Sequence, residues 1–478
     1  MNIRKYQVLC EVCDQILTNN ISTPQIVANN YFHILNSHPE FLEKYDLSMV
    51  TKAWLPLRFR LIYIVRVIQS IFDRKFFYNK QEYIKSDVLF VSHLTSERQL
   101  LSDSDAYFGN LSKLLLKQGM SSSTALINHT NISNRKVLSS WKGSEVHRIL
   151  LSSNLDFLSE IKLYFSQKKS KKQLSHALKS LKVDRILIKD MMCNHLSSDT
   201  FNALRIATQV AHIAKKTEAK YVVTTYEGYA WERLVYYYVR KINPSIKCLG
   251  YQHAAVFKHQ HAIKRPLNNR YNPDVFLTSG LVTKEIFEQS QLKDFKIVCI
   301  GSPKHLAPSL ATGEKQCCLV VPEGIVSECL ILFKFSLSYA TQHPEQKFIW
   351  RLHPLLNFER LRKYSNFFKK IPDNIYLSGG GLDEDIQKCD SVLYRGSTAV
   401  VNAINAGLKP IYYQQSVGEL SIDPIYQQRL GKGVVKNQRE LSFALNKDLN
   451  RKDRKTLQDF AQNFYTPLDV HALMVAML

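Results

Sequence analysis

Residues 391–407 read SVLYRGSTAVVNAINAG, and this stretch contains the repeating unit of the fold. Its first four residues predict a short strand, Gly396, Ser397 and Thr398 predict a turn, and the rest predicts a helix that ends at Gly407. Short apolar runs separated by helical stretches recur along the chain from about residue 83. Such alternation is typical of βα repeats around a parallel sheet.

The apolar runs fall into two series, each long enough for one Rossmann-like domain. The first series predicts strands at 87–92, 123–128, 147–152, 185–189, 221–225, 247–251 and 275–278. The second predicts strands at 297–300, 318–321, 348–352, 375–377, 391–394 and 410–413. We therefore predict an α/β protein with two Rossmann-like domains, whose strands point their carboxyl ends into a common cleft.

The predicted domain organisation has four parts. The boundary between the two sheets falls between 280 and 315 and is set at 290. The parts are a helical extension at 1–82, an N-terminal domain at 83–290, a C-terminal domain at 291–450, and a helical segment at 451–478 that can pack back on the first domain.

The composition is that of a globular protein with a strong basic excess. The 478 residues include 64 Lys and Arg against 41 Asp and Glu, a formal net charge of +23. Such a charge attracts nucleic acid, anionic membranes or phosphorylated substrates. No zinc-finger spacing, RNP-type aromatic signature or basic zipper occurs, so we predict no nucleic-acid partner. Nine scattered cysteines and the lack of an apolar leader at 1–17 favour a reducing cytoplasm.

One segment, 54–77, combines apolar residues with arginines. Its apolar residues, such as Leu61 and Ile68, are interrupted by Arg58, Arg60, Arg66, Arg74 and Lys75. The pattern suits a basic amphipathic helix on an anionic membrane surface. It suits equally a helix packed on the first domain with its arginines in solvent. No run of some 18 apolar residues predicts a spanning helix.

Two motifs in the second series have the chemistry of a phosphate site. Arg351 and His353 alternate at the end of the strand KFIW, so both side chains point to one side of the chain, and Pro354 ends the strand. Arginine and histidine can hold a phosphate through charge-assisted hydrogen bonds. The turn Gly396, Ser397 and Thr398 adds hydroxyls and backbone N–H groups at a helix start, where anions bind.

These two motifs, RLHP at 351–354 and GST at 396–398, resemble those of bacterial GT-B glycosyltransferases that use CMP-activated acidic sugars, the sialyltransferases and Kdo transferases. The resemblance implies that His353 with Pro354, and Ser397 with Thr398, bind the nucleotide-sugar donor. The segments 298–304 (VCIGSPK) and 318–328 (CLVVPEGIVSE) also look like parts of surface-carbohydrate biosynthesis proteins. Ser302 and Glu323 in these segments are further candidates for donor binding.

The same family carries a (D/E)(D/E)G motif that supplies the general base. Its nearest match is Tyr226-Glu227-Gly228 after the strand YVVTT, with tyrosine in place of the first acid. Glu227 is therefore our candidate base, and Asp190, after the predicted strand RILIK, is its rival. His253 follows the next strand in a QHAA stretch that resembles the QHG-like loop of capsule and teichoic-acid-type transferases, and could contact donor or acceptor.

We expect no required metal or other cofactor, because the histidines His259 and His261 have no carboxylate at a metal-ligand spacing. The first function hypothesis is transfer of an acidic sugar from a CMP donor to a capsule or lipopolysaccharide-type glycan or glycolipid at the inner face of the cell membrane. The alternatives are a CDP-glycerol-type polyol-phosphate transferase, a UDP-sugar transferase, a nucleotide-sugar epimerase, or a non-catalytic polyanion-binding protein.

Overall fold

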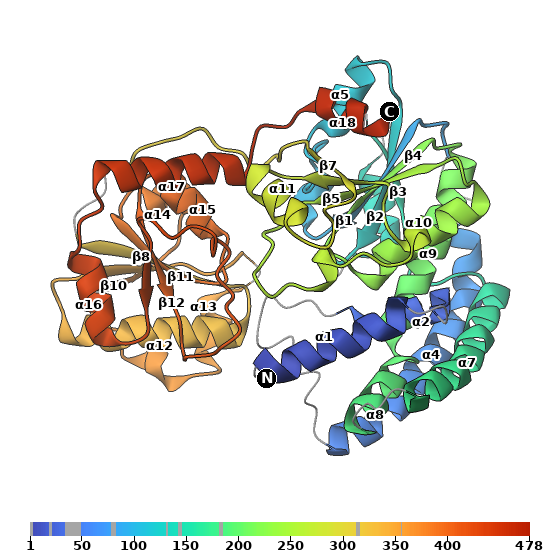
Figure 1. Ribbon diagram of the computed structural model, residues 1–478, viewed down its shortest axis with the longest axis horizontal. Helices are drawn as coiled ribbons and strands as arrows, with labels where there is room; N and C mark the ends of the chain where they lie inside the picture. Colours follow the sequence, from blue (N-terminus) through green and yellow to red (C-terminus); the bar gives the residue numbers. More distant parts are fainter. Residues whose placement is uncertain are drawn as a thin grey trace.

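The computed structural model describes residues 3–18, 22–33, 49–77, 83–130, 132–141, 146–180, 185–311, 316–354 and 356–478. Two α/β domains lie side by side, and a group of helices from the N-terminal part of the chain lies below the first of them in the view of Figure 1. The α/β class with two Rossmann-like sheets, the GT-B arrangement, is confirmed.

The first sheet has seven parallel strands in the order β3-β2-β1-β4-β5-β6-β7. The chain runs outward from β1 in one direction and returns at β4 to run in the other. The crevice beyond the carboxyl ends of β1 and β4 is the place where open α/β sheets bind ligands. The strands are β1 (Val88–Leu94), β2 (Ser122–Asn128), β3 (His147–Leu150), β4 (Tyr221–Thr225), β5 (Lys247–Gln252), β6 (Val275–Thr278) and β7 (Lys296–Cys299).

The second sheet has six parallel strands in the order β10-β9-β8-β11-β12-β13. Its reversal point lies between β8 and β11. The three-residue strand β13 was not predicted, because GVV is too short to show a period. The strands are β8 (Cys317–Pro322), β9 (Lys347–Trp350), β10 (Ile375–Leu377), β11 (Ser391–Arg395), β12 (Lys409–Tyr413) and β13 (Gly433–Val435).

Helices cover both sheets, which explains why strands such as β8 and β11 are buried at every position. Around the first sheet lie η2 (Glu97–Leu100), α5 (Leu111–Lys117), α6 (Asn134–Ser140), α9 (Ser198–Lys216), α10 (Ala230–Ile242), η3 (Ala262–Lys264), η4 (Asn269–Tyr271) and α11 (Leu281–Glu288). Around the second lie α12 (Val326–Gln342), α13 (Phe358–Arg362), η5 (Asn366–Lys369), α14 (Leu382–Ile386), α15 (Ala399–Asn405) and α16 (Gln438–Asn446).

The N-terminal part is helical where it is described, and two later helices join it (Figure 1). A buried ion pair fastens this group to the first domain: Arg205 on α9 donates to Glu160 on α7 at 2.7 and 2.9 Å. In the described ranges no helix is both long and apolar enough to cross a membrane. The helices of this group are α1 (Ile3–Thr18), α2 (Pro24–Val27), η1 (Asn30–Phe32), α4 (Met49–Phe77), α7 (Phe157–Ser180) and α8 (Arg185–Asn194).

Two predicted strands require correction. Residues 185–189 are helical and open α8, whose Ile188 and Met191 pack into the N-terminal core at helix spacing. A short apolar run fits a strand or a buried helix equally well, and here tertiary packing decided. Residues 297–300 form β7, which pairs with β6 in the first sheet instead of opening the second. The first sheet therefore extends to Cys299, beyond the predicted boundary at 290.

The last two helices connect the domains. α17 (Arg451–Phe464) packs against α15 of the second domain and α11 of the first. α18 (Val470–Met477) then lies beside α5 and β7, at the top of the first domain in Figure 1. The chain thus crosses between the domains twice, once after β7 and once between α17 and α18.

Candidate functional site

Glu227 lies at the reversal point of the first sheet, directly after β4. The turn that carries it needs Gly228, which has a φ of 83° and whose added Cβ would lie 2.5 Å from the backbone of Ala262. Glu232, at the start of α10, accepts backbone hydrogen bonds from Glu227, Gly228 and Tyr229 at 2.8–3.0 Å. Glu232 is therefore a capping residue that fixes the turn on which Glu227 stands.

The environment of Glu227 suits a proton acceptor. Removal from water in the cleft raises the pKa of its carboxyl, while a hydrogen bond from Tyr229 and the charge of Lys304 lower it. Tyr226, which stands where the first acid was expected, is fully buried in the core and packs its ring against Phe276. The motif at 226–228 therefore has one carboxylate, that of Glu227, in place of the two acids of the family pattern.

Two histidines that sequence analysis missed lie beside this turn. His93, near the end of β1, is 2.9 Å from His129 (Nδ1 to Nε2) and 3.0 Å from the Thr225 hydroxyl (Nε2 to Oγ1). Burial, and then the nearby His129, lowers the pKa of His93 to about 3, so its imidazole is neutral at pH 7. The sequence offered one signal for them, since each histidine directly follows one of the first two predicted strands.

His253, Tyr107 and Lys304 extend this group. The rings of His253 and Tyr107 meet edge-on with centroids 4.4 Å apart, and Tyr107 also meets His93 at 5.5 Å. Within the described ranges the buried His253 Nδ1 has no hydrogen-bond partner. Burial, followed by the charge of Lys304, lowers the pKa of His253 well below its usual value. The structure thus brings His253 and Glu227 together around Lys304.

A cavity of about 370 Å³ lies at the carboxyl end of the second sheet. We call it the second-domain cavity. Both donor motifs contribute to it, and Lys304, from the connection between the sheets, lines it as well. Of the predicted donor residues, the cavity is lined by Arg351, His353, Pro354, Ser397 and Thr398.

His353 is held in this cavity by close packing on Gly324. A Cβ added at Gly324 would lie 2.9 Å from His353 Cγ, so only glycine lets the imidazole sit against the β8 loop. Burial lowers the pKa of His353, and the charge of Glu323 opposes this shift. Glu323 acts on His353 in this way without lining the cavity, and its role in donor binding stays a prediction.

The turn after β11 presents hydroxyls to the cavity. Gly396 adopts a φ of 74° and bridges to Pro322, while Ser397 Oγ accepts a hydrogen bond from Ala399 N–H at 3.4 Å. The preceding residue, Arg395, is buried and pairs with Glu328 and Glu419. The helix that follows, α15, has only seven residues. We therefore take the hydroxyls of Ser397 and Thr398, and not the start of this short helix, as the polar groups that serve the cavity.

Arg351 and Ser302 have partners that the sequence did not indicate. Arg351 lines the cavity, but its Nη1 donates to Asp385 at 2.7 Å, to Ser378 at 3.0 Å and to Gly380 O at 2.9 Å. Ser302 is buried, and its hydroxyl accepts the Lys304 backbone N–H at 3.1 Å. Ser302 thus shapes the turn that positions Lys304 and is not among the residues that line the cavity.

Asp190 does not follow a strand, because it belongs to helix α8 in the N-terminal helical group. Its side chain is buried among those helices. The strand end that made it a rival base is therefore absent at this position.

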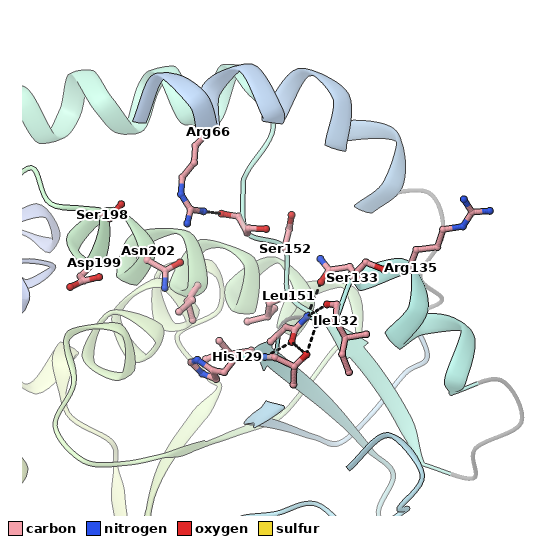
Figure 2. A pocket seen from close by; sticks show the side chains of 16 residues that line it. Arg66, His129, Ile132, Ser133, Arg135, Leu151, Ser152, Ser198, Asp199 and Asn202 are labelled. Carbon is pink, nitrogen blue, oxygen red and sulfur yellow. Dashed lines mark hydrogen bonds between the residues drawn. The ribbon is translucent and has the colours of Figure 1, made fainter. Parts of the chain in front are cut away.

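A larger cavity, of about 710 Å³, lies at the carboxyl ends of β2 and β3, and we call it the first-domain cavity. Figure 2 shows hydroxyl and amide side chains around it and Arg66 reaching down from α4. Arg66 Nη1 donates to Ser153 O at 2.8 Å. His129 lines this cavity and also contacts His93, so the histidine pair joins the cavity to the turn of Glu227. The other polar residues that line it are Asn128, Thr130, Ser133, Asn134, Arg135, Ser152, Ser153, Ser198, Asp199 and Asn202.

His261, one of the two histidines considered as metal ligands, has structural partners. His261 Nε2 lies 2.9 Å from Asp14 of α1, and Arg265 Nη1 binds the same carboxylate at 2.8 Å. These contacts tie α1 to the first domain. Among the described residues there is no group of three or more His, Cys, Asp or Glu placed to hold a metal ion.

No protein-family model matches the chain, and no curated protein does. Among solved structures, the glycotransferase of kitacinnamycin is 10% identical and has a TM-score of 0.47, covering 82% of this chain and 98% of that one. The UDP-GlcNAc 2-epimerase of Methanocaldococcus jannaschii is 11% identical with a TM-score of 0.43, covering 78% and 98%. The S. aureus MnaA-UDP structure is 9% identical with a TM-score of 0.45, covering 82% and 95%. Because these TM-scores are below 0.5, the fold assignment rests on the two sheets themselves.

Proposed function

We propose that the protein is a glycosyltransferase that moves an acidic sugar from a CMP-linked donor to a glycan or glycolipid acceptor, with Glu227 as general base. One observation carries this proposal. Lys304 lines the second-domain cavity and its charge also acts on Glu227 and His253. Lys304 Nζ also donates to His253 O at 3.4 Å, so the same positive charge would act on a phosphate in that cavity and on the turns that carry His253 and Glu227.

The donor half follows from the chemistry of the second-domain cavity. Ser397 and Thr398 supply hydroxyl donors, His353 supplies an imidazole, and Lys304 supplies a positive charge. Together these groups suit a phosphate that gains charge as the sugar leaves. The RLHP and GST motifs, which favour CMP through their resemblance to the sialyltransferases and Kdo transferases, both line this cavity.

The transfer step needs one base. The acceptor hydroxyl oxygen attacks the anomeric carbon, its proton passes to the Glu227 carboxylate, and the bond from the anomeric carbon to the phosphate oxygen breaks with its electrons going to CMP. The raised pKa of Glu227 makes it a stronger proton acceptor than an ordinary carboxylate. The neutral imidazoles of His93 and His253 can position the acceptor without competing for the role of charged base.

The first-domain cavity is our candidate acceptor site. Its hydroxyl and amide lining matches the hydrogen-bonding groups of a sugar, and Arg66 can pair with an acidic one. A separate polar cavity in the first domain favours an enzyme with two substrates over an epimerase, which needs a single nucleotide sugar and further acids in the cleft.

The proposal also includes the place of action, the cytoplasmic side of the cell membrane, where glycolipid acceptors are anionic. It includes the absence of a required metal, because Lys304, His353 and the hydroxyls can stabilise the leaving phosphate in its place.

The first experiment measures thermal stabilisation of the purified protein by CMP, CDP, UDP and GDP, because a ligand that binds only the folded state raises the melting temperature. The proposal expects stabilisation by CMP, and loss of that response in Ser397→Ala. Stabilisation by UDP or CDP instead would overturn the donor and favour a UDP-sugar or polyol-phosphate transferase. No response to any nucleotide would favour a non-catalytic polyanion-binding protein.

A further inference from the structure

One face of helix α4 carries a continuous row of exposed apolar side chains. We call it the α4 stripe, and its members are each 48–66% exposed. Isolated exposed apolar residues are ordinary on a protein surface, but a contiguous set marks an interaction site. The stripe consists of Trp54, Leu57, Leu61, Ile64, Val65, Ile68 and Ile71.

The spacing of these residues places them on one side of the helix. They recur at intervals of three and four, so at 3.6 residues per turn they form a band along the axis about 25 Å long. The side chains of Leu55, Phe72, Arg74 and Lys75, which the sequence pattern also included, lie outside the described part of the chain.

The opposite side of α4 is already occupied. Tyr63 stacks on Tyr164 with ring centroids 4.9 Å apart and lies equally close to Phe201. Arg66 bonds to Ser153 O over the first-domain cavity, and Ser70 is buried. These contacts fix the rotation of the helix, so the stripe points away from the protein.

The charges beside the stripe identify its partner. At about 100° per residue, Arg58 and Arg60 fall on opposite edges of the stripe, and both are exposed. The segment 54–71 contains no Asp or Glu, and the whole chain carries a formal charge of +23. An apolar face with arginines along both edges complements the acyl boundary and the anionic head groups of a lipid bilayer.

A second copy of the chain fits this surface less well. A two-fold pairing of the stripe with itself would line both of its seams with arginines from the two copies, and the stripe offers no acid to neutralise them. We therefore propose that α4 docks the protein on an anionic membrane, lying in the plane of the surface with its stripe inserted at the interface.

This docking deepens the place of action in the proposed function, but it can be tested separately, since it needs neither donor nor catalysis. If the proposed function also holds, docking places the first-domain cavity, which Arg66 roofs from the inner side of α4, close to a membrane-held acceptor (Figure 2).

The test is cosedimentation of the full chain with vesicles, in the absence of any nucleotide sugar. We expect binding to mixed phosphatidylglycerol and phosphatidylcholine vesicles, weaker binding to phosphatidylcholine alone, and release at high salt. Ile64→Asp and Ile68→Asp should each lower the partition coefficient by about tenfold or more. Arg58→Gln and Arg60→Gln should each lower it about fivefold, on anionic vesicles only.

The matched control is the pair Leu116→Asp and Val475→Asp, two exposed apolar residues on helices α5 and α18. This pair should bind vesicles like the unchanged protein. The proposal is overturned if the stripe variants bind vesicles as well as the unchanged protein does. It is also overturned if the arginine variants keep their affinity for anionic vesicles. A dimer in light scattering that the stripe substitutions convert to a monomer, without vesicle binding by the unchanged protein, would assign the stripe to self-association instead.

Discussion

The two sheets share one strand pattern but place different chemistry at their reversal points. At the carboxyl ends of β1, β4 and β5 the first domain gathers His93, Glu227 and His253, all with pKa values moved by burial. Beside β8 and β11 the second domain gathers the hydroxyls of Ser397 and Thr398 with His353. One edge therefore suits proton transfer and the other suits phosphate binding.

This difference shows that the scaffold alone does not decide the chemistry of a ligand site. Both crevices follow from the same parallel topology, so each was a possible ligand site before any side chain was considered. Desolvation separates them, because a carboxylate in a partly dry cleft holds its proton more tightly, whereas hydroxyls need no charge change to bind an anion. Lys304 lies between the two sets and belongs to both.

The sharpest test of this division between proton transfer and phosphate binding is substitution of the proposed base. Glu227→Gln should lower turnover by about 10²–10⁴-fold, because no carboxylate then accepts the acceptor's proton. CMP affinity should change little, since the second-domain cavity is intact. Steady-state kinetics and titration calorimetry measure the two quantities separately. Asp190→Asn is the control and should keep its turnover; the reverse result for the two variants would move the base to α8.

Substitution of Lys304 should affect both proton transfer at the first sheet and phosphate binding at the second. Lys304→Met should lower turnover by about 10²-fold through the lost stabilisation of the leaving phosphate. Because the charge of Lys304 lowers the pKa of Glu227, the rising limb of kcat/KM against pH should move to higher pH in this variant. Lys296→Met, an exposed lysine on β7, is the matched control. An unchanged pH profile would show that the charge of Lys304 does not act on the base.

The second-domain edge alone is probed by His353. His353→Ala should weaken CMP binding by about 1.5–3 kcal/mol, or about 10- to 150-fold in Kd, with a smaller change in turnover. Since burial lowers the pKa of His353, its imidazole gains charge only as pH falls, so CMP affinity should rise toward acid pH in the unchanged protein and not in the variant. His343→Ala, at a half-buried histidine of the same domain that does not line the cavity, should behave like the unchanged protein in calorimetry.

The smallest expected effect is a gain in stability. The pKa of Glu227 is raised in the folded state, so the folded state binds this proton more tightly than the unfolded state does. The free energy of unfolding therefore falls as pH rises from the ordinary carboxyl range through the raised value. Above that window Glu227→Gln should melt at a higher temperature than the unchanged protein, and a lower melting temperature in calorimetry would show that the carboxylate stabilises the fold.

Most strands could be predicted from local pattern, because a strand buried on both faces is an apolar run whatever it pairs with. The donor motifs were also visible, since RLHP and GST each combine a strand end and its polar residues within a few positions. Arg351 shows the limit: the sequence placed it beside His353, but it could not show that Asp385, 34 positions later, holds its guanidinium.

By itself the sequence determined the α/β class, the repeat of two series, and Glu227, His353, Ser397 and Thr398 as residues at strand ends. Only the tertiary structure assigned 297–300 to the first sheet, made 185–189 a helix, joined His93 to His129, and turned the apolar side of α4 outward. The physical reason is range: periodicity and turn chemistry act over a few residues, whereas strand pairing, burial and pKa shifts depend on groups that only folding brings together.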